Sequence, residues 1–258
     1  MRIALCQISS TADPATNLAT VRTEVTRAAE AGARIVQFPE ATHCRFGVPL
    51  APVAEPLDGP WATAVHDIAT EAGVVVVAGM FTPGTGGRVA NTTLVTGADL
   101  HLGYDKIHLF DAFGFRESDT VTPGDKPVTF TVDDLTFGLA TCYDVRFPEL
   151  FRTLANTAQA ILLGASWGAG PGKADQWDLL VRARALDSTA WLLACGQALP
   201  TTDHGPAPTG IGRSTVVTPL GAVAASLADA PGTLVSDVDA SSVDEARRTL
   251  PVLANRRL

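Results

Sequence analysis

Cys142 marks an abrupt change in the hydrophobic pattern of the chain. Residues 135–141 (LTFGLAT) suit a buried strand, and after the cysteine apolar residues recur at helical spacing, at positions 150, 151, 154 and 158. On such a strand-to-helix turn, the backbone N–H groups of the following residues are free to bind a developing negative charge. A thiolate nucleophile for acyl transfer needs this geometry. The alternative is a buried structural cysteine, which is what most free cysteines are.

Two further ionisable residues, Glu40 and Lys106, lie where predicted strands end. Glu40 follows a strand predicted for residues 34–38, and Lys106 follows one predicted for residues 100–104. Each alone is compatible with a solvated surface position, but together with Cys142 they form a chemical set. The carboxylate could take the thiol proton, and the ammonium could stabilise both the thiolate and the negative charge formed by attack on an amide or nitrile carbon. Water would then release the acid from the covalent intermediate.

Strands and helices alternate in the first half of the chain, and strands dominate the second half. This order predicts one α/β domain with layered sheets and helices outside. The loop of residues 105–125 is long and irregular, and such loops are often functional. The predicted helices are residues 17–31, 63–72, 176–188 and 242–250, the last with Ser241 or Ser242 as its N-cap. The predicted strands are residues 2–9, 34–38, 74–80, 90–96, 100–104, 128–132, 135–141, 160–165, 191–195, 212–218, 222–226 and 232–237.

The composition argues against several classes of function. A net charge of −8 over 258 residues and a pI near 5.0 disfavour a nucleic-acid or anionic-membrane partner, since both require a basic face. The four cysteines fit no zinc spacing and no GxGxxG follows a predicted strand, so we expect neither a metal nor a cofactor. No secretory leader or membrane-length apolar run occurs, which predicts a cytoplasmic protein with reduced thiols. The glycosylation pattern at Asn91-Thr92-Thr93 carries no meaning there.

The chain resembles the nitrilase, or carbon–nitrogen hydrolase, superfamily in three segments that follow in the family's order and spacing. They are FPE at 38–40, YDKIHLF at 104–110 and CYDVRFPEL at 142–150. The resemblance covers essentially the whole chain and implies a single carbon–nitrogen hydrolase domain over residues 1–258. It further implies a four-layer α-β-β-α sandwich that pairs as a homodimer.

The resemblance also implies roles for individual residues. Cys142 would be the nucleophile, Glu40 the general base and acid, and Lys106 the stabiliser of the tetrahedral intermediate. Glu117, in FRESDT, matches a second glutamate of the family. We expect it to position Lys106 or the attacking water, although a solvated loop glutamate is the alternative. The backbone N–H of Tyr143 is expected to add a hydrogen bond to the oxyanion.

Several residues near this set are expected to border the substrate. Trp167 is favoured over Trp177 as a pocket wall because it follows the strand predicted for residues 160–165. Arg213 could bind a substrate carboxylate, or it could be a surface arginine. The loop residues that could also border the site are Phe46, His43 and Phe113.

Charged residues around the nucleophile turn are expected to be structural. A network of Asp144, Arg146 and Glu149 is predicted beneath the turn, because a buried arginine needs partners. Asp187 is expected to cap its helix or to pair with an arginine, Arg182 or Arg184.

Within the superfamily, YDKIHLF and CYDVRFPEL look most like the omega-amidase and deaminated-glutathione amidase group. Gln176 and Arg213 depart from it, because that group commonly has histidine at both positions. We therefore predict hydrolysis of a non-peptide C–N bond in a small carboxamide through a cysteine thioester, with release of ammonia and a carboxylic acid. The alternatives are an acyltransferase or an N-carbamoyl hydrolase on the same fold, or a catalytically silent binding protein. Nitrile hydrolysis is disfavoured because the nitrilase branch typically runs longer.

Overall fold

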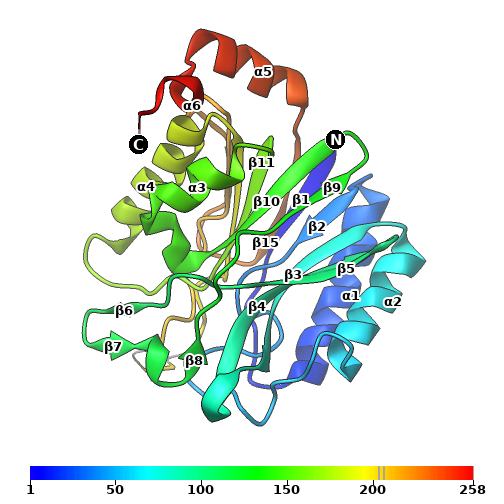
Figure 1. The fold of residues 1–258 in the computed structure, drawn as a ribbon. Coiled ribbons are helices and arrows are strands. Elements are labelled where there is room, and N and C mark those ends of the chain that lie inside the picture. The colour runs from blue at the N-terminus through cyan, green and yellow to red at the C-terminus, as the bar shows by residue number, and fades with distance from the viewer. Residues whose placement is uncertain (203, 206, 258) are drawn as a thin grey trace.

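Two β-sheets stack face to face in the computed structural model, and helices cover both outer faces (Figure 1). The structure describes residues 1–202, 204–205 and 207–257. The first sheet has the strand order β15-β1-β2-β3-β4-β5, with β8 beside β4, and the second has the order β14-β13-β12-β11-β10-β9. The predicted four-layer α-β-β-α sandwich is confirmed.

The first sheet consists of β1 (Arg2–Gln7), β2 (Ile35–Gln37), β3 (Val75–Pro83), β4 (Val89–Gly97), β5 (Leu100–Asp105), β8 (Val121–Thr122) and β15 (Gly232–Asp237). The second consists of β9 (Thr129–Val132), β10 (Leu135–Thr141), β11 (Ala160–Ala165), β12 (Trp191–Gly196), β13 (Thr215–Val217) and β14 (Val223–Ser226). The α-helices are α1 (Pro14–Glu30), α2 (Pro60–Ala72), α3 (Pro148–Leu154), α4 (Lys173–Ser188), α5 (Ala240–Thr249) and α6 (Val252–Asn255).

Both sheets are built around the same kind of connection. In the first, β1, β2 and β3 are parallel neighbours joined through α1 and α2. In the second, β10, β11 and β12 are parallel neighbours joined through α3 and α4. Parallel neighbours need such crossovers, which place the helices on the faces of the sheets. The segments that follow β2, β10 and β11 then meet, and they carry Glu40, Cys142 and Ser166.

Three apolar layers hold the sandwich together. The middle layer lies between the sheets and includes Leu5 from the first sheet and Phe137 and Leu193 from the second. The outer layers lie under the helices, with Val21 of α1 on one side and Trp177 of α4 on the other. Strands covered on both faces must be apolar throughout, which explains the continuous apolar runs in the sequence.

Several element boundaries differ from the sequence prediction. The strand predicted from residue 212 begins only at Thr215, because Gly212 and Arg213 have φ values of 69° and 60°, outside the extended region. The predicted N-cap of α5 is wrong, because Asp239 precedes the helix. The Asp239 carboxylate accepts a hydrogen bond from the backbone N–H of Ser242, so the serine hydroxyls are left to donate to that same carboxylate.

The predicted loop of residues 105–125 contains short ordered elements that face the site. A hairpin of β6 (Asp111–Ala112) and β7 (Phe115–Arg116) is followed by the 3₁₀ helix η2 (Glu117–Asp119).

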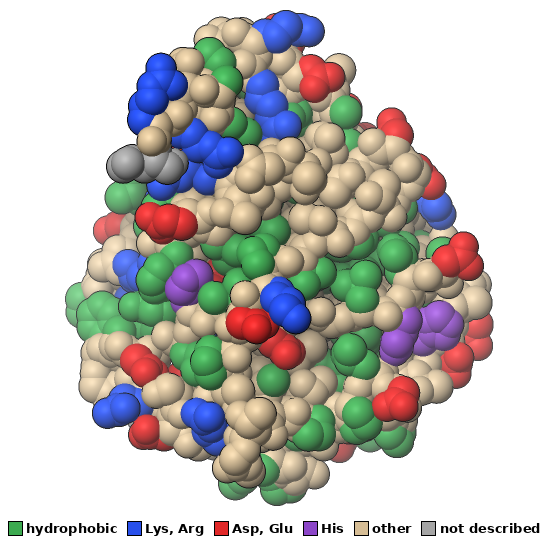
Figure 2. Space-filling model, in the orientation of Figure 1, with side chains coloured by type: hydrophobic (Ala, Val, Ile, Leu, Met, Phe, Trp, Pro, Cys, Tyr) green, Lys and Arg blue, Asp and Glu red, His purple; other side chains and the backbone are tan. Residues whose placement is uncertain are grey.

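Figure 2 shows basic side chains gathered over α5 and α6, whereas the rest of that face mixes both charges. Across the described residues, no helix combines the length and the apolar character needed to cross a bilayer.

Candidate active site

Cys142 lies on a sharp turn directly after β10, as the sequence predicts. The turn is the 3₁₀ helix η3 (Cys142–Arg146), and Cys142 itself has φ 48°, a left-handed conformation that is strained for a residue with a side chain. A reciprocal capping box holds the turn, in which the Thr141 side chain accepts from the Asp144 backbone and the Asp144 side chain accepts from the Thr141 N–H. The conformation of Cys142 is therefore imposed by its surroundings.

Asp144 anchors this turn from below. Its fully buried carboxylate accepts hydrogen bonds from the Tyr104 hydroxyl at 2.7 Å and from the His108 backbone N–H at 3.0 Å. Its Oδ1 also lies 2.7 Å from His108 Nδ1. A buried carboxylate needs such partners, and here they come from the segment that also carries Lys106. The nucleophile turn and the lysine segment are thus tied together.

The predicted network of Asp144, Arg146 and Glu149 is wrong. Arg146 donates to the Gln176 side chain at 2.6 Å instead. Glu149 lies exposed in the first turn of α3, where its ion pair is with Arg152 at 3.8 Å. The physical reason is that Asp144 already has its acceptors filled by the partners beneath the turn, so it needs no arginine.

Glu40 enters the space between the two sheets directly after β2. Glycines on both sides make room for it, because a Cβ at Gly79 of β3 would come within 2.7 Å of the Glu40 Cα, and one at Gly164 of β11 within 3.0 Å of its N. The carboxylate is 1% exposed. It accepts hydrogen bonds from Asn91 Nδ2 at 2.8 Å, Lys106 Nζ at 3.0 Å and the Ser166 N–H at 2.7 Å.

Lys106 is buried between two carboxylates. Its Nζ lies 3.0 Å from Glu40 Oε1 and 2.9 Å from Glu117 Oε2. Burial by itself lowers the pKa of Lys106, but the charges of Glu117 and Glu40 outweigh burial, and the pKa is raised well above its usual value. Glu117 is held in turn by the backbone N–H of Phe110 at 2.7 Å. The lysine is therefore a fixed cation, and Glu117 is a buried partner of it, not a solvated loop residue.

Asn91 and Ser166 belong to the site but were not found from the sequence. Asn91 Nδ2 donates to both Glu40 and Glu117, so this one amide joins the two carboxylates. The available signal was a lone asparagine in β4, a strand whose residues are all buried. Ser166 contributes its backbone N–H to Glu40, and a peptide group leaves no signal in the sequence.

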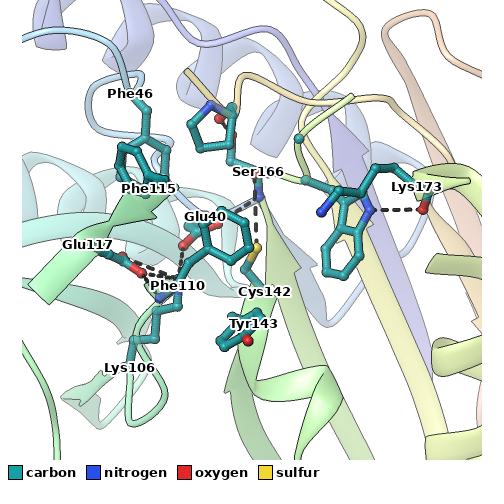
Figure 3. Close-up of a pocket in the computed structure, with 13 residues that line it drawn as sticks. Glu40, Phe46, Lys106, Phe110, Phe115, Glu117, Cys142, Tyr143, Ser166 and Lys173 are labelled. Atoms are coloured by element: carbon teal, nitrogen blue, oxygen red, sulfur yellow. Dashed lines mark hydrogen bonds and ion pairs between the residues drawn. The ribbon is translucent and has the colours of Figure 1, made fainter. Parts of the chain in front are cut away.

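The site opens into a pocket of about 440 Å³, counting the space open to solvent. Figure 3 shows Cys142 between the Glu40–Lys106–Glu117 group and Lys173. Of the predicted site residues, the pocket is lined by Glu40, Phe46, Lys106, Glu117, Cys142, Tyr143 and Trp167. It is also lined by Phe110, Phe115, Ser166, Gly168, Lys173 and Pro208. A narrow apolar cavity with a few polar groups at one end suits a small ligand.

Arg213 is not brought to this pocket, so its expected contact with substrate is corrected. Its guanidinium pairs with the Asp178 carboxylate of α4, and its backbone carbonyl accepts a hydrogen bond from Trp177 Nε1. The positive φ of Arg213 and this ion pair hold the side chain in a separate surface hollow. His43 is also elsewhere, packed against Trp61 with the ring centroids 4.8 Å apart and the ring planes tilted by 44°.

Residues 2–248 match the family described as carbon-nitrogen hydrolase. The chain belongs to the carbon-nitrogen hydrolase family. The match spans nearly the whole chain and includes the segments that carry Glu40, Lys106 and Cys142.

In the described residues, no group of three or more His, Cys, Asp or Glu side chains could hold a metal ion.

Curated relatives of this hydrolase align over almost its full length. Hydrolase Rv0480c of Mycobacterium tuberculosis is 54% identical over 269 residues, which cover 99% of this chain and 95% of that protein. Omega-amidase NIT2 of Homo sapiens is 32% identical over 265 residues, which cover 99% of this chain and 95% of that protein. The similarity therefore extends well beyond the three short motifs.

Solved structures share its fold. Nit3 of Saccharomyces cerevisiae, a member of branch 10 of the nitrilase superfamily, has a TM-score of 0.87 at 25% identity, covering 100% of this chain and 97% of that one. A variant of the amidase from Nesterenkonia sp. AN1 has a TM-score of 0.82 at 26% identity, covering 100% of this chain and 94% of that one. That structure shows covalent addition of the acetamide moiety of fluoroacetamide at its active site cysteine.

The surroundings of Cys142 favour its protonated form. Burial, followed by the negative charge of Glu40, raises the pKa of Cys142 well above its usual value, and the positive charge of Lys106 only partly opposes this. Lys106 therefore favours the thiolate, as expected, but its effect is too small to bring the pKa of Cys142 below the usual value. Among the neighbouring carboxylates, Glu40 raises the pKa of Cys142 most strongly.

Proposed function

We propose that this hydrolase cleaves the C–N bond of a small carboxamide through a thioester on Cys142, releasing ammonia and a carboxylic acid. The observation that carries the proposal is the buried Glu40–Lys106–Glu117 group lining one small pocket with a cysteine on a strained turn. The relatives support it, since one is named an omega-amidase and another is an amidase with a covalently modified active site cysteine.

In the first half-reaction, the thiol of Cys142 attacks the amide carbon while Glu40 accepts the sulfur proton. Negative charge then develops on the carbonyl oxygen, where the Lys106 ammonium and the Tyr143 backbone N–H stabilise it. Protonated Glu40 then gives the proton to the departing nitrogen. The C–N bond breaks, ammonia leaves, and an acyl group remains on the sulfur.

In the second half-reaction, water replaces ammonia beside Glu40. Glu40 takes a proton from the water as the water oxygen attacks the thioester carbon, and the same oxyanion donors act again. The C–S bond breaks, the acid leaves, and Glu40 returns the proton to the sulfur. One amide and one water are consumed for each ammonia and acid formed, so the protein ends unchanged.

Three neighbours serve as positioning residues in this scheme. Glu117 is the second carboxylate that binds Lys106, and Asn91 donates to both carboxylates and so fixes the distance between them. Asp144 holds the nucleophile turn against the segment that carries Lys106. Pre-organised groups of this kind stabilise a developing charge without reorganising during the reaction.

The test is ammonia release from a panel of small amides by the wild type and by Cys142→Ala. The panel includes succinamate, 2-oxoglutaramate, deaminated glutathione, aliphatic amides and N-carbamoyl compounds. We expect turnover on one class of carboxamide, lost in the variant. Turnover that survives the substitution would contradict the mechanism, and turnover of N-carbamoyl compounds alone would contradict the substrate class.

The predicted single domain, homodimer and cytoplasmic location remain proposals. Light scattering on the purified chain tests the dimer, for which a mass of twice 26.8 kDa is expected. A mass of 26.8 kDa at micromolar concentration would contradict it.

A further inference from the structure

The four tryptophans of the chain differ in what their indole N–H groups meet. Three of them donate to a backbone carbonyl at 3.0 Å: Trp167 to Lys173, Trp177 to Arg213 and Trp191 to Asp239. Trp61, the second residue of α2, is 4% exposed, and its Nε1 is buried without a hydrogen-bond partner among the described residues. A buried N–H group without a partner costs free energy, so the exception at Trp61 needs an explanation.

His43 packs against Trp61 and lacks a partner in the same way. The side chain is 2% exposed, and its Nδ1 is buried with no hydrogen bond in the described part of the chain. Burial lowers the pKa of His43 to about 4, so the ring is neutral at pH 7. A neutral imidazole has one nitrogen that donates and one that accepts, whereas the indole nitrogen of Trp61 only donates. Two adjacent rings therefore hold polar atoms that a ligand with both a donor and an acceptor would satisfy.

Both rings line a surface hollow where α1 and α2, which lie side by side, begin (Figure 1). The hollow has a volume of about 690 Å³, counting the space open to solvent. Its wall is largely apolar and includes Leu18 of α1, with Pro52 and Val53 from the segment between β2 and α2. Among the described residues, none lines both this hollow and the Cys142 pocket. The hollow is therefore separate from the candidate active site.

The charges around the hollow disfavour both kinds of ion. Helix N-termini attract anions, but here each already binds a carboxylate of the chain. Asp13 accepts from backbone N–H groups in the first turn of α1, and Glu55 Oε1 accepts from the backbone N–H of Trp61 at 2.6 Å. Among the described residues, no lysine or arginine lines the hollow to bind a further anion. A cation would suit Glu55, but an ammonium group offers no acceptor for the indole N–H of Trp61.

We propose that this hollow binds a small neutral molecule that carries a hydroxyl or primary amide group on a short alkyl chain. The oxygen of that group accepts a hydrogen bond from Trp61 Nε1, and its hydrogen is donated to His43 Nδ1. The alkyl chain lies against the apolar wall of the hollow. Binding thus gives a partner to two buried nitrogens. The proposal is independent of the proposed amidase function, because Glu40, Lys106 and Cys142 take no part in it.

The experiment follows the indole N–H signals by NMR in full-length protein labelled with ¹⁵N at tryptophan. Cys142→Ala is used so that no amide is consumed, and each signal is assigned by a Trp→Phe substitution. Four probes with the same number of carbons are titrated separately: butanol, butyramide, butyrate and butylammonium. The Trp61 signal reports the hollow, and the Trp167 signal reports the Cys142 pocket. One titration therefore shows at which of the two sites a probe binds.

Substitutions then test the named contacts. His43→Phe keeps an aromatic ring but removes its nitrogens, and should raise the Kd of the bound probe about 3- to 10-fold, the scale of one hydrogen bond. His66→Phe is the matched control, because His66 also lies on α2 but does not line the hollow. Val53→Phe fills the hollow and should abolish binding while every histidine stays in place. The signals of Trp167, Trp177 and Trp191 show whether each variant is folded.

We expect butanol, butyramide or both to shift the Trp61 signal until it saturates, and butyrate and butylammonium to leave it unchanged. A response to only one neutral probe would support the proposal and decide between the hydroxyl and the amide. A Trp61 signal that no probe shifts, or that an ion shifts as strongly as a neutral probe, would overturn it. A shift of Trp167 alone would place the probe in the Cys142 pocket, and this too would contradict the proposal.

Discussion

The inner and outer ends of the Cys142 pocket are held in opposite ways. At the inner end, Glu40, Lys106 and Glu117 are at most 3% exposed, and each is fixed by several hydrogen bonds. At the outer end, Lys173 is half-buried and rests on Phe113, which is 74% exposed. Several hydrogen bonds fix each charged side chain at the inner end. The contacts at the outer end are weak and easily exchanged.

The rigid inner end suits catalysis, and the loosely held outer end suits substrate selection. A buried charge group tolerates little change, because removal of one member leaves another charge unpaired. Exposed ring and ammonium contacts can change at little cost to the fold. Substitutions at the inner end should therefore lower kcat for every substrate, whereas those at the outer end should change which substrate is preferred.

Cys142→Ala should have the largest effect. It removes the nucleophile, so we expect kcat/KM to fall by about 10⁴-fold or more, with the thermal unfolding temperature nearly unchanged. Cys44→Ala is the matched control, because Cys44 is also a buried free cysteine but does not line the pocket. Ammonia release measures the loss, and equal activity in the two variants would contradict the nucleophile assignment.

Glu40→Gln keeps the size of the side chain and removes the base. We expect kcat to fall by about 10²- to 10⁴-fold, the range for loss of a general base. The pH dependence of the residual rate should also change, which a purely structural role would not produce. Glu149→Gln, an exposed glutamate beyond the nucleophile turn, should keep wild-type rates. Loss of activity in both variants to the same degree would remove the case for Glu40 as the base.

Glu117→Gln tests a positioning role within the same buried group. It weakens the hold on Lys106 without touching the sulfur, so kcat should fall by about 10- to 100-fold with KM almost unchanged. An effect as large as that of Glu40→Gln would instead make Glu117 a second base. Steady-state kinetics on the best amide distinguish the two.

The raised pKa of Cys142 predicts how its alkylation depends on pH. Only the thiolate reacts, and the thiolate fraction rises about tenfold per pH unit below the pKa, so iodoacetamide should label Cys142 faster at each step from pH 7 to 9. Lys106→Met removes the opposing positive charge and should slow labelling at every pH. Peptide mass spectrometry reads out the site, and a labelling rate that levels off below pH 8 would contradict the raised pKa.

Phe113→Ala should have the smallest effect. Phe113 is exposed and its described contacts are with Lys173 and Phe110, so we expect the free energy of unfolding to change by less than about 0.5 kcal/mol. Activity on a neutral amide should change only a few-fold, roughly the scale of an exposed cation–π contact. A large loss in stability on chemical denaturation would show that the outer end is not loosely held.

The sequence predicts which side chains meet at the inner end of the pocket, because their residue types form a chemical set. Glu40, Lys106 and Cys142 lie in three recognisable segments, and the alternation of strands and helices explains why the segments meet. The hydrogen bond from the Ser166 backbone N–H to Glu40 could not be predicted, because nearly every residue has a backbone N–H. Asn91 was visible as a residue but not as a contact, because pairing across the sheet depends on register.

The partners of other charged residues could not be predicted in the same way. An arginine in a sequence does not reveal which acid it will meet, and the pairing of Arg213 with Asp178 depends on where α4 packs. Asp144 was assigned to a network with Arg146 and Glu149 because a buried arginine needs partners, but Asp144 accepts hydrogen bonds from the segment that carries Lys106. The sequence does not predict that Lys173 lines the pocket, because this depends on the three-dimensional arrangement of the chain.

The covalent step is tested most directly by trapping the acyl enzyme. Wild-type protein is mixed with succinamate, quenched in acid within one turnover, and digested for peptide mass spectrometry. We expect the mass of a succinyl group on the peptide that contains Cys142, formed in step with the first equivalent of ammonia and absent from Cys142→Ala. Ammonia release without any acyl group on Cys142, or with the acyl group on another residue, would contradict the thioester mechanism.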